Sequence, residues 1–172
     1  AVNPYKPHPK VLEPGGPEAP DHLDIKFYGT VIRIDGELRM WYIGVGEENG
    51  ERRGPHICCA VSQDGINWEK PELDLVEFNG NKRNNLVQFD SPYRQSIAAL
   101  LVLYEPEDPD PGRRFKLITE IHPFHNIAAF SPDGLSWTES PHNPILPHNA
   151  IEPGGLMKFN GCYYMNGQGG NV

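Results

Sequence analysis

The chain has 172 residues, enough for one ordinary domain with a sizeable core. Gly and Pro number 18 each, a composition that suits short strands joined by tight turns better than helices. The formal net charge is −8, and neither a basic run nor an apolar stretch of roughly 20 residues is present. Nucleic acid and a membrane are therefore not expected as partners.

The N-terminal region, residues 1–21, is rich in Pro and predicts an extended arm without regular structure. A first set of strands follows, with a hairpin turn at Asp35-Gly36 and a polar loop over Glu47–Pro55. These strands are expected at Phe27–Ile34, Leu38–Val45 and His56–Ser62, with a weaker fourth near Leu73–Phe78.

The same pattern of strands then restarts. The second set is expected at Ile97–Tyr104, Arg113–Ile121 and Asn126–Ser131. A third set begins with Gly154–Phe159, turns at Asn160-Gly161 and continues through Cys162–Met165. No 3.6-residue apolar period persists long enough to predict a helix.

A repeated phrase explains this periodicity. Ser62–Trp68 and Ser131–Trp137 share the frame S-x-D-G-x-x-W and start 69 residues apart. A repeat of this kind indicates one supersecondary unit used several times. We therefore predict an all-β fold, a β-propeller of four-stranded antiparallel blades, with about two and a half blades of an expected five. Blade one is expected over about 22–89, blade two over 90–147, and the start of blade three over 148–172.

The repeated turn itself is expected to have a structural role. Gly supplies the positive φ of a tight turn, Asp64 and Asp133 can bond the local backbone, and Trp can pack between sheets. In a blade with strands A to D, these turns lie on the face away from the usual propeller active site. The D–A and B–C loops lie on the other face and are therefore the candidates for chemistry.

Each D–A segment brings a carboxylate toward that face. The candidates are Asp24, Asp90 and Glu152. Cleavage of a glycosidic bond needs one protonated carboxyl to protonate the leaving oxygen and one ionised carboxylate to attack the anomeric carbon or activate water. Convergent carboxylates therefore predict a glycoside hydrolase.

Three phrases also resemble the five-bladed propeller glycoside hydrolases, which include arabinanases, β-xylosidases, invertases and levansucrases. They are Arg39-Met40-Trp41-Tyr42, Ser62–Pro71 and Asn84-Asn85-Leu86-Val87, and the resemblance covers about residues 24–172. It implies Asp24 as base or nucleophile, Asp90 as the residue that modulates pKa and positions substrate, and Glu152 as the acid. It further implies a carbohydrate substrate and a secreted or periplasmic location. No cofactor or metal is expected, and the oligomeric state stays open.

The acids do not match in register. Asp24, Asp90 and Glu152 lie 10, 14 and 7 residues before the ends of their A strands, and Arg94 occupies the position equivalent to Asp24 in blade two. Arg94, Tyr28 and His125 are the expected substrate-binding residues. Two alternatives stay open: a non-catalytic propeller that binds carbohydrate or protein, and an inactive truncated chain.

Two other groups are expected to be structural. Cys58, Cys59 and Cys162 form an odd set, so buried free thiols are expected rather than a disulfide framework, with Cys58 and Cys59 on opposite faces of a strand. The acidic hairpin at 105–110 is expected to be a solvated turn rather than a calcium site.

Overall fold

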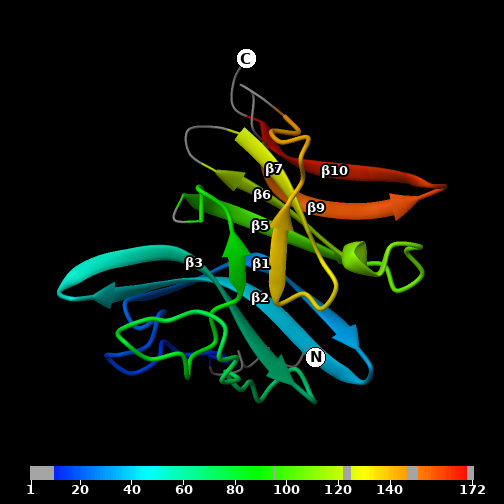
Figure 1. Cartoon of the computed structure of the whole chain (residues 1–172). Coiled ribbons are helices and arrows are strands. Elements are labelled where there is room, and N and C mark those ends of the chain that lie inside the picture. The colour runs from blue at the N-terminus through cyan, green and yellow to red at the C-terminus, as the bar shows by residue number, and fades with distance from the viewer. Residues whose placement is uncertain (1–9, 95, 122–124, 147–150, 170–172) are drawn as a thin grey trace, which may run out of the picture.

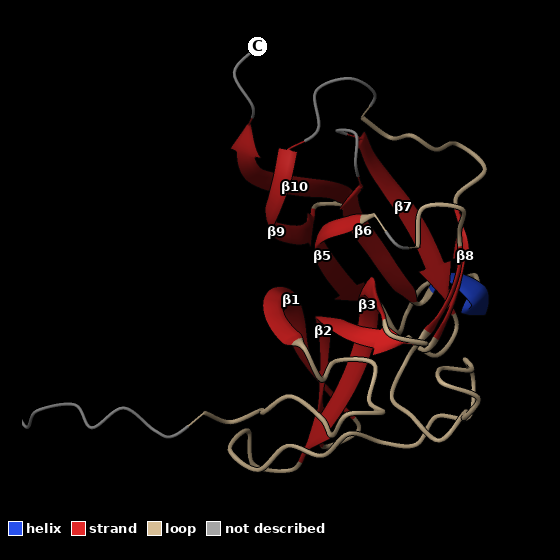
Figure 2. Cartoon of the chain, turned by 90° about the vertical axis from the view of Figure 1, so that its left-hand side faces the viewer, coloured by secondary structure: helices blue, strands red, loops and turns tan. Residues whose placement is uncertain are grey.

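The computed structural model describes residues 10–94, 96–121, 125–146 and 151–169. Its strands form three sheets that lie one above another, which confirms the predicted partial β-propeller (Figure 1). The strands are β1 (Asp24–Ile34), β2 (Glu37–Glu48), β3 (Glu51–Ser62), β4 (Gln88–Asp90), β5 (Ile97–Tyr104), β6 (Phe115–Ile121), β7 (His125–Ser131), β8 (Ser136–Glu139), β9 (Ile151–Phe159) and β10 (Cys162–Gly169). A single 3₁₀ turn, η1 (Pro111–Arg113), is the helical element of the described residues (Figure 2).

The first blade is the antiparallel sheet β1–β2–β3. The polar loop predicted over Glu47–Pro55 is wrong, because β2 and β3 continue as one long hairpin around a two-residue turn at Asn49-Gly50. Both turn residues have positive φ, the geometry that hairpin turns favour. Glu47 lies opposite Arg52 in the register, so opposite charges face each other across this extension.

The fourth strand of this blade also differs from the prediction. Leu73–Phe78 is not a strand, and Asp74 within it has a φ of +57 that interrupts an extended chain. Segment 85–87 takes the place beside β3 instead: Cys59 N–H donates to the Asn85 carbonyl at 2.9 Å, and Val87 N–H donates to the Ile57 carbonyl at 3.1 Å. The next three residues, β4, pair in parallel with β8. One short segment thus joins the first two blades.

The second blade is the antiparallel order β5–β6–β7–β8, with β4 added at its outer edge. The third is the β9–β10 hairpin. The inner strands of neighbouring blades adjoin, since β1 lies beside β5 and β5 beside β9. This adjacency of A strands is the geometry from which a propeller channel is built.

The main core fills the space between the first two blades. It includes the fully buried Trp41, Leu100, Leu117 and Trp137. A second cluster on the opposite face of blade one contains Tyr42, Phe78 and Leu86.

The cysteines fall on both sides of this division. As predicted, Cys58 and Cys59 are buried on opposite faces of β3, one in each cluster. Burial raises the pKa of the Cys59 thiol to about 12, so it stays a thiol. The expectation for Cys162 is wrong: it is exposed, because it lies on β10, a strand whose side chains are mostly exposed.

The end of the N-terminal arm is fixed to blade one. The Asp21 carboxylate is fully buried and accepts hydrogen bonds from the Tyr42 hydroxyl at 2.6 Å and the Gly15 N–H at 3.1 Å. Lys70 Nζ lies 2.6 Å from the same carboxylate. A buried carboxylate with three partners of this kind anchors the chain ahead of β1.

No helix in the described part of the chain is long and apolar enough to cross a membrane.

Candidate functional site

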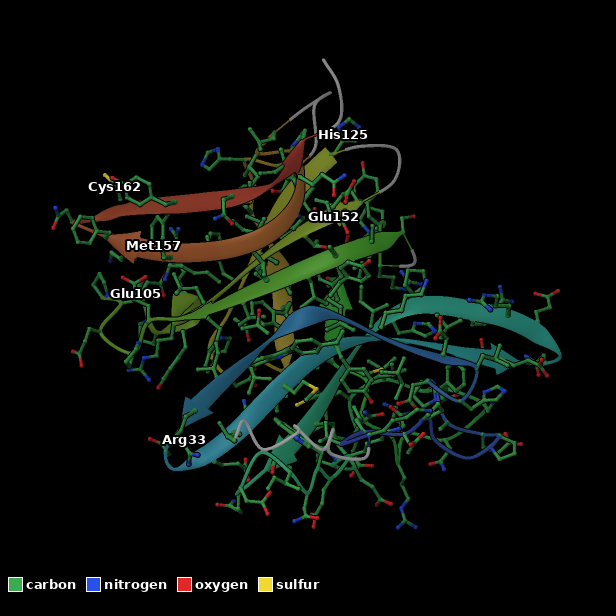
Figure 3. All side chains as sticks on the ribbon, turned by 180° about the vertical axis from the view of Figure 1, so that it is seen from behind. Arg33, Glu105, His125, Glu152, Met157 and Cys162 are labelled. Carbon is green, nitrogen blue, oxygen red and sulfur yellow. The ribbon has the colours of Figure 1, made fainter. Side chains whose placement is uncertain are left out.

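Whether the predicted site residues can act together depends on the end of the sheets at which each of them lies. Because β1, β5 and β9 run in the same direction, their first residues lie at one end of the molecule. Figure 3 shows Glu152 and His125 at this end, and Arg33, Glu105, Met157 and Cys162 at the other. Asp24 is the first residue of β1, so it also belongs to the first end. We call this end the A-start face.

A cavity of about 520 Å³ is lined by residues of β3, by segment 75–90 and by the residues that lead into β5. The apolar part of its lining includes Ile57, Phe78 and Ile97. Asp90 and Arg94 line it, so the structure brings two of the six predicted residues into one cavity. Asp24, Tyr28, His125 and Glu152 are not among its lining residues. A volume of this size suits a small-molecule ligand.

Charged groups line the same cavity. Neither Asp90 nor Arg94 forms a side-chain hydrogen bond or ion pair with another described residue. Lys82 and Glu77 line the cavity as well. Side chains without protein partners can bond a ligand without first breaking an existing contact. The cavity therefore offers an anionic and a cationic group together with apolar lining residues.

His56 also lines this cavity, although the sequence analysis did not select it as a site residue. Burial lowers its pKa to about 4; Glu48 opposes the shift, and Arg94 and Arg53 add to it. The imidazole is consequently neutral near pH 7. Its Nε2 is buried without a partner in the described structure, and its ring meets Phe78 edge-on at 5.6 Å. A neutral imidazole can donate or accept a hydrogen bond.

The start of β9 is held by a buried side chain. Asn126 Nδ2 donates to the Ile151 carbonyl at 2.9 Å, and the Ile151 N–H donates to Asn126 Oδ1 at 2.9 Å. Asn126 is fully buried, and Glu152 is the next residue along β9. Asn126 therefore fixes the backbone that carries Glu152.

Glu120 lies beside this clamp. It is opposite Asn126 in the β6–β7 ladder and is only 8% exposed. A carboxylate so deeply buried is unusual in proteins. Sequence reasoning missed both residues, although an acid within the apolar run of β6 was a visible signal for Glu120.

Of the four predicted residues outside the cavity, Tyr28 is exposed, and Asp24, His125 and Glu152 have intermediate burial. Asp24 is half-exposed, and Lys26 Nζ lies 3.9 Å from its carboxylate. Tyr28 is 51% exposed.

The repeated turns have the structural role that was predicted. Asp64 Oδ1 accepts from the N–H groups of Ile66 and Asn67, both at 2.8 Å, and these bonds hold the pKa of Asp64 well below its usual range. In the second copy, the indole N–H groups of Trp41 and Trp137 both donate to the Gly134 carbonyl, at 2.7 and 3.1 Å. This turn thus fastens blade two to blade one.

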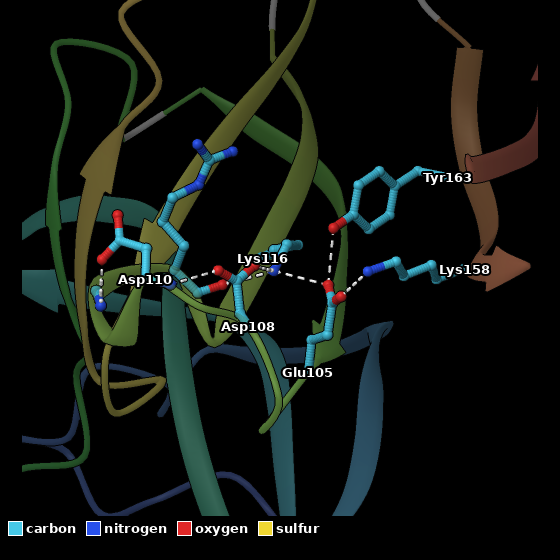
Figure 4. Close-up of polar contacts among 8 residues, drawn as sticks. Glu105, Asp108, Asp110, Lys116, Lys158 and Tyr163 are labelled. Atoms are coloured by element: carbon cyan, nitrogen blue, oxygen red, sulfur yellow. Dashed lines mark hydrogen bonds and ion pairs between the residues drawn. The ribbon is translucent and has the colours of Figure 1, made fainter. Parts of the chain in front are cut away.

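The carboxylates of the acidic hairpin at 105–110 form ion pairs with two lysines. Glu105 lies 2.8 Å from Lys116 Nζ, which is also 2.6 Å from Asp108, and Glu105 accepts from Tyr163 Oη at 2.7 Å and from Lys158 (Figure 4). Lys158 and Tyr163 belong to the third blade, so this cluster ties the β9–β10 hairpin to blade two. Among the described residues no group of three or more metal-ligating side chains is assembled.

Stacked antiparallel blades with adjoining inner strands define a β-propeller, and solved structures with similar folds include candidate glycoside hydrolases. One is a candidate glycoside hydrolase from Parabacteroides distasonis ATCC 8503, with 17% identity and a TM-score of 0.57 over 95% of this chain and 51% of that one. Another, from Bacteroides ovatus ATCC 8483, has 17% identity and a TM-score of 0.54 over 90% and 50%.

A third similar structure comes from the GH130 family of mannoside phosphorylases, which contains glycoside hydrolases that target β-1,2-mannosidic linkages in Candida mannan. It has 14% identity and a TM-score of 0.55 over 91% of this chain and 47% of that one. The chain therefore spans about half the length of these proteins. No family model matches the sequence, and no curated protein matches it. The predicted resemblance to propeller glycoside hydrolases is confirmed at the level of the fold.

Proposed function

We propose that this chain supplies the glycan-binding part of a propeller glycoside hydrolase, with its sugar pocket in the cavity that contains Asp90 and Arg94. The cavity carries this proposal: it has a volume of about 520 Å³, lies by the start of β5 and presents a carboxylate and a guanidinium that pair with no other residue the structure describes. Sugar hydroxyls can donate to the first and accept from the second. The neutral His56 adds a further hydrogen-bonding group.

In this proposal, catalysis uses two carboxyl groups with complementary roles. Glu152 is the acid that gives its proton to the glycosidic oxygen as the C–O bond breaks. Asp24 is the base that takes a proton from the attacking water, or the nucleophile that bonds the anomeric carbon before water releases the sugar. Asp90 positions the sugar and modulates the acid's pKa. Asn126 holds the backbone beside Glu152 in place.

The experiment measures binding and cleavage separately on one panel of neutral oligosaccharides. The panel contains β-1,2-mannobiose, arabinotriose and xylotriose, each tested with and without inorganic phosphate because the GH130 neighbour's family contains phosphorylases and hydrolases. We expect Asp90→Asn and Arg94→Ala each to weaken binding about tenfold or more, and Glu152→Gln to abolish cleavage while the sugar still binds.

The matched control is Asp110→Asn, an exposed acid at the opposite end of the molecule. It should bind and cleave like the wild type. Binding that survives both Asp90→Asn and Arg94→Ala without change would overturn the assignment of the cavity.

A non-catalytic carbohydrate- or protein-binding propeller is the second candidate. One observation favours it: of the three predicted acids, only Asp90 lines the cavity, and a cation, Arg94, lies beside it. If this second candidate is correct, a sugar binds but no panel member is cleaved, and Glu152→Gln leaves sugar binding unchanged.

A further inference from the structure

The inner strand of every blade is irregular near its start. The β1–β2 register shifts between Lys26 and Thr30, and the β5–β6 register shifts between Ile97 and Ala99. On the third blade the partners of β9 jump from Pro153 to Gly155, which leaves Gly154 unpaired. Bulges of this kind are concentrated next to active sites, where they re-aim side chains. All three lie toward the A-start face.

The bulge in β1 carries two large aromatic side chains. Phe27, Tyr28 and Gly29 lie opposite the single residue Tyr42, because Lys26 pairs with Ile43 and Thr30 pairs with Trp41. In a regular strand neighbouring residues point to opposite faces. Here both aromatics are exposed instead, Phe27 at 57% and Tyr28 at 51%.

Gly29 allows the bulge to form. A Cβ at this position would overlap the backbone carbonyl of Trp41, so any other residue would push β1 away from β2. The conformation that exposes the two aromatics therefore depends on a specific residue.

The other two bulges carry no large side chain. Ala98 and Gly154 stand where Phe27 and Tyr28 stand in blade one. Burial of large aromatic side chains stabilises a fold, so two adjacent exposed aromatics forgo that stability. Their place toward the A-start face distinguishes them from Phe159 and Tyr164, which are equally exposed on the third blade. An exposed apolar group on the face that carries the proposed site can contact a ligand bound there.

We propose that Phe27 and Tyr28 form a stacking platform for the ring of a neutral sugar. The proposal rests on the proposed function, since it assigns a further part of the same glycan site. The faces of both aromatic rings carry partial negative charge, and the C–H bonds on the apolar face of a sugar ring carry partial positive charge. The net charge of −8 disfavours acidic sugars and leaves neutral ones as the ligand class.

The test is calorimetric titration of the panel member that binds the wild-type chain most tightly. Phe27→Ala and Tyr28→Ala should each raise Kd by about 2–12-fold, the range of a single aromatic contact. Tyr28→Phe keeps the ring and should bind within about twofold of the wild type. Circular dichroism of each variant checks that the fold is intact.

The third blade offers matched controls at the opposite end. Phe159 is 57% exposed and Tyr164 is 52% exposed, almost the same as Phe27 and Tyr28. Phe159→Ala and Tyr164→Ala should leave Kd unchanged.

Three results would overturn the platform. One is a Kd unchanged by both Phe27→Ala and Tyr28→Ala in a chain whose binding is weakened by Arg94→Ala; this removes the platform and leaves the proposed function standing. Another is a wild-type chain that binds no panel member, which removes both the platform and the proposed function. A Tyr28→Phe variant as weak as Tyr28→Ala would show that the hydroxyl acts, and stacking does not.

Discussion

The Glu105 cluster makes a pH-dependent contribution to stability that can be measured directly. Hydrogen bonds from Lys116, Lys158 and Tyr163 lower the pKa of Glu105 from 4.5 to about 2. The whole shift corresponds to about 3 kcal/mol of preference for the ionised form. Water and salt screen a cluster near the surface, so we expect about 1–2 kcal/mol to appear as stability.

The sign follows from the depressed pKa. Above about pH 4.5 Glu105 is ionised in the folded and the unfolded chain, and the stabilisation is fully present. It is lost as the pH falls from 4.5 toward 2, where the folded carboxylate is protonated as well. Glu105→Gln should therefore lower the free energy of unfolding by about 1–2 kcal/mol at pH 7, and the gap should shrink below pH 4.

Urea unfolding at pH 7 and pH 3 measures this gap, with Glu107→Gln as the control. Glu107 lies in the same hairpin and is exposed, so its substitution removes the same charge without breaking the cluster. Amide hydrogen exchange should show in addition that β9 and β10 lose protection in Glu105→Gln. A gap of the same size at both pH values would refute the electrostatic reasoning, and unchanged protection would refute the role in docking the third blade.

Three further substitutions test other parts of the fold. Asp21→Asn leaves Lys70 beside a neutral buried group and should cost about 2–4 kcal/mol in urea unfolding; a loss below about 1 kcal/mol would contradict the anchor. Gly134→Ala places a methyl 2.8 Å from the Trp41 ring at a φ of +76, so its melting temperature should fall further than that of Gly80→Ala, which has a φ of +71 and open space; equal falls would argue against the clash. Asn126→Ala removes both hydrogen bonds to Ile151 and should speed amide exchange at the start of β9; unchanged exchange would remove the clamp.

The strands that were predicted correctly are those with local signals. Asp35-Gly36 and Asn160-Gly161 each lie between apolar runs, and each joins two strands as expected. The same signal was present at Asn49-Gly50, but the charged residues around it favoured a loop. The strands continue there because cross-strand pairs such as Glu47 and Arg52 suit an exposed hairpin.

The fourth strand of blade one could not be predicted from local patterns. Leu73–Phe78 has the alternation of a strand, but segment 85–87 takes the edge of β3. The choice between the two depends on pairing with a distant strand, which propensity does not encode. The cavity shares this origin, because it lies between residues of β3 and the segment that leads into β5.

The irregular register of the predicted acids has a similar physical cause. Asp24 and Glu152 lie 10 and 7 residues before the ends of their strands, but bulges insert extra residues into both. Counted on the regular partner strands, Asp24 lies opposite Val45, eight residues from Glu37, and Glu152 lies opposite Gln168, six residues from Cys162. The difference falls from three residues to two, about 7 Å along a strand.

Counting residues on the partner strand also relates the position of Glu152 to that of the cavity. Ile97 lies opposite Ile121, six residues from Phe115, so it occupies the same level of its blade as Glu152 does in the next. Ile97 also lines the cavity with Asp90 and Arg94. Each bulge adds residues to a strand without adding pairs to its hydrogen-bonded ladder. The position of a residue in the ladder, rather than its residue count along the strand, therefore decides which side chains of neighbouring blades can meet.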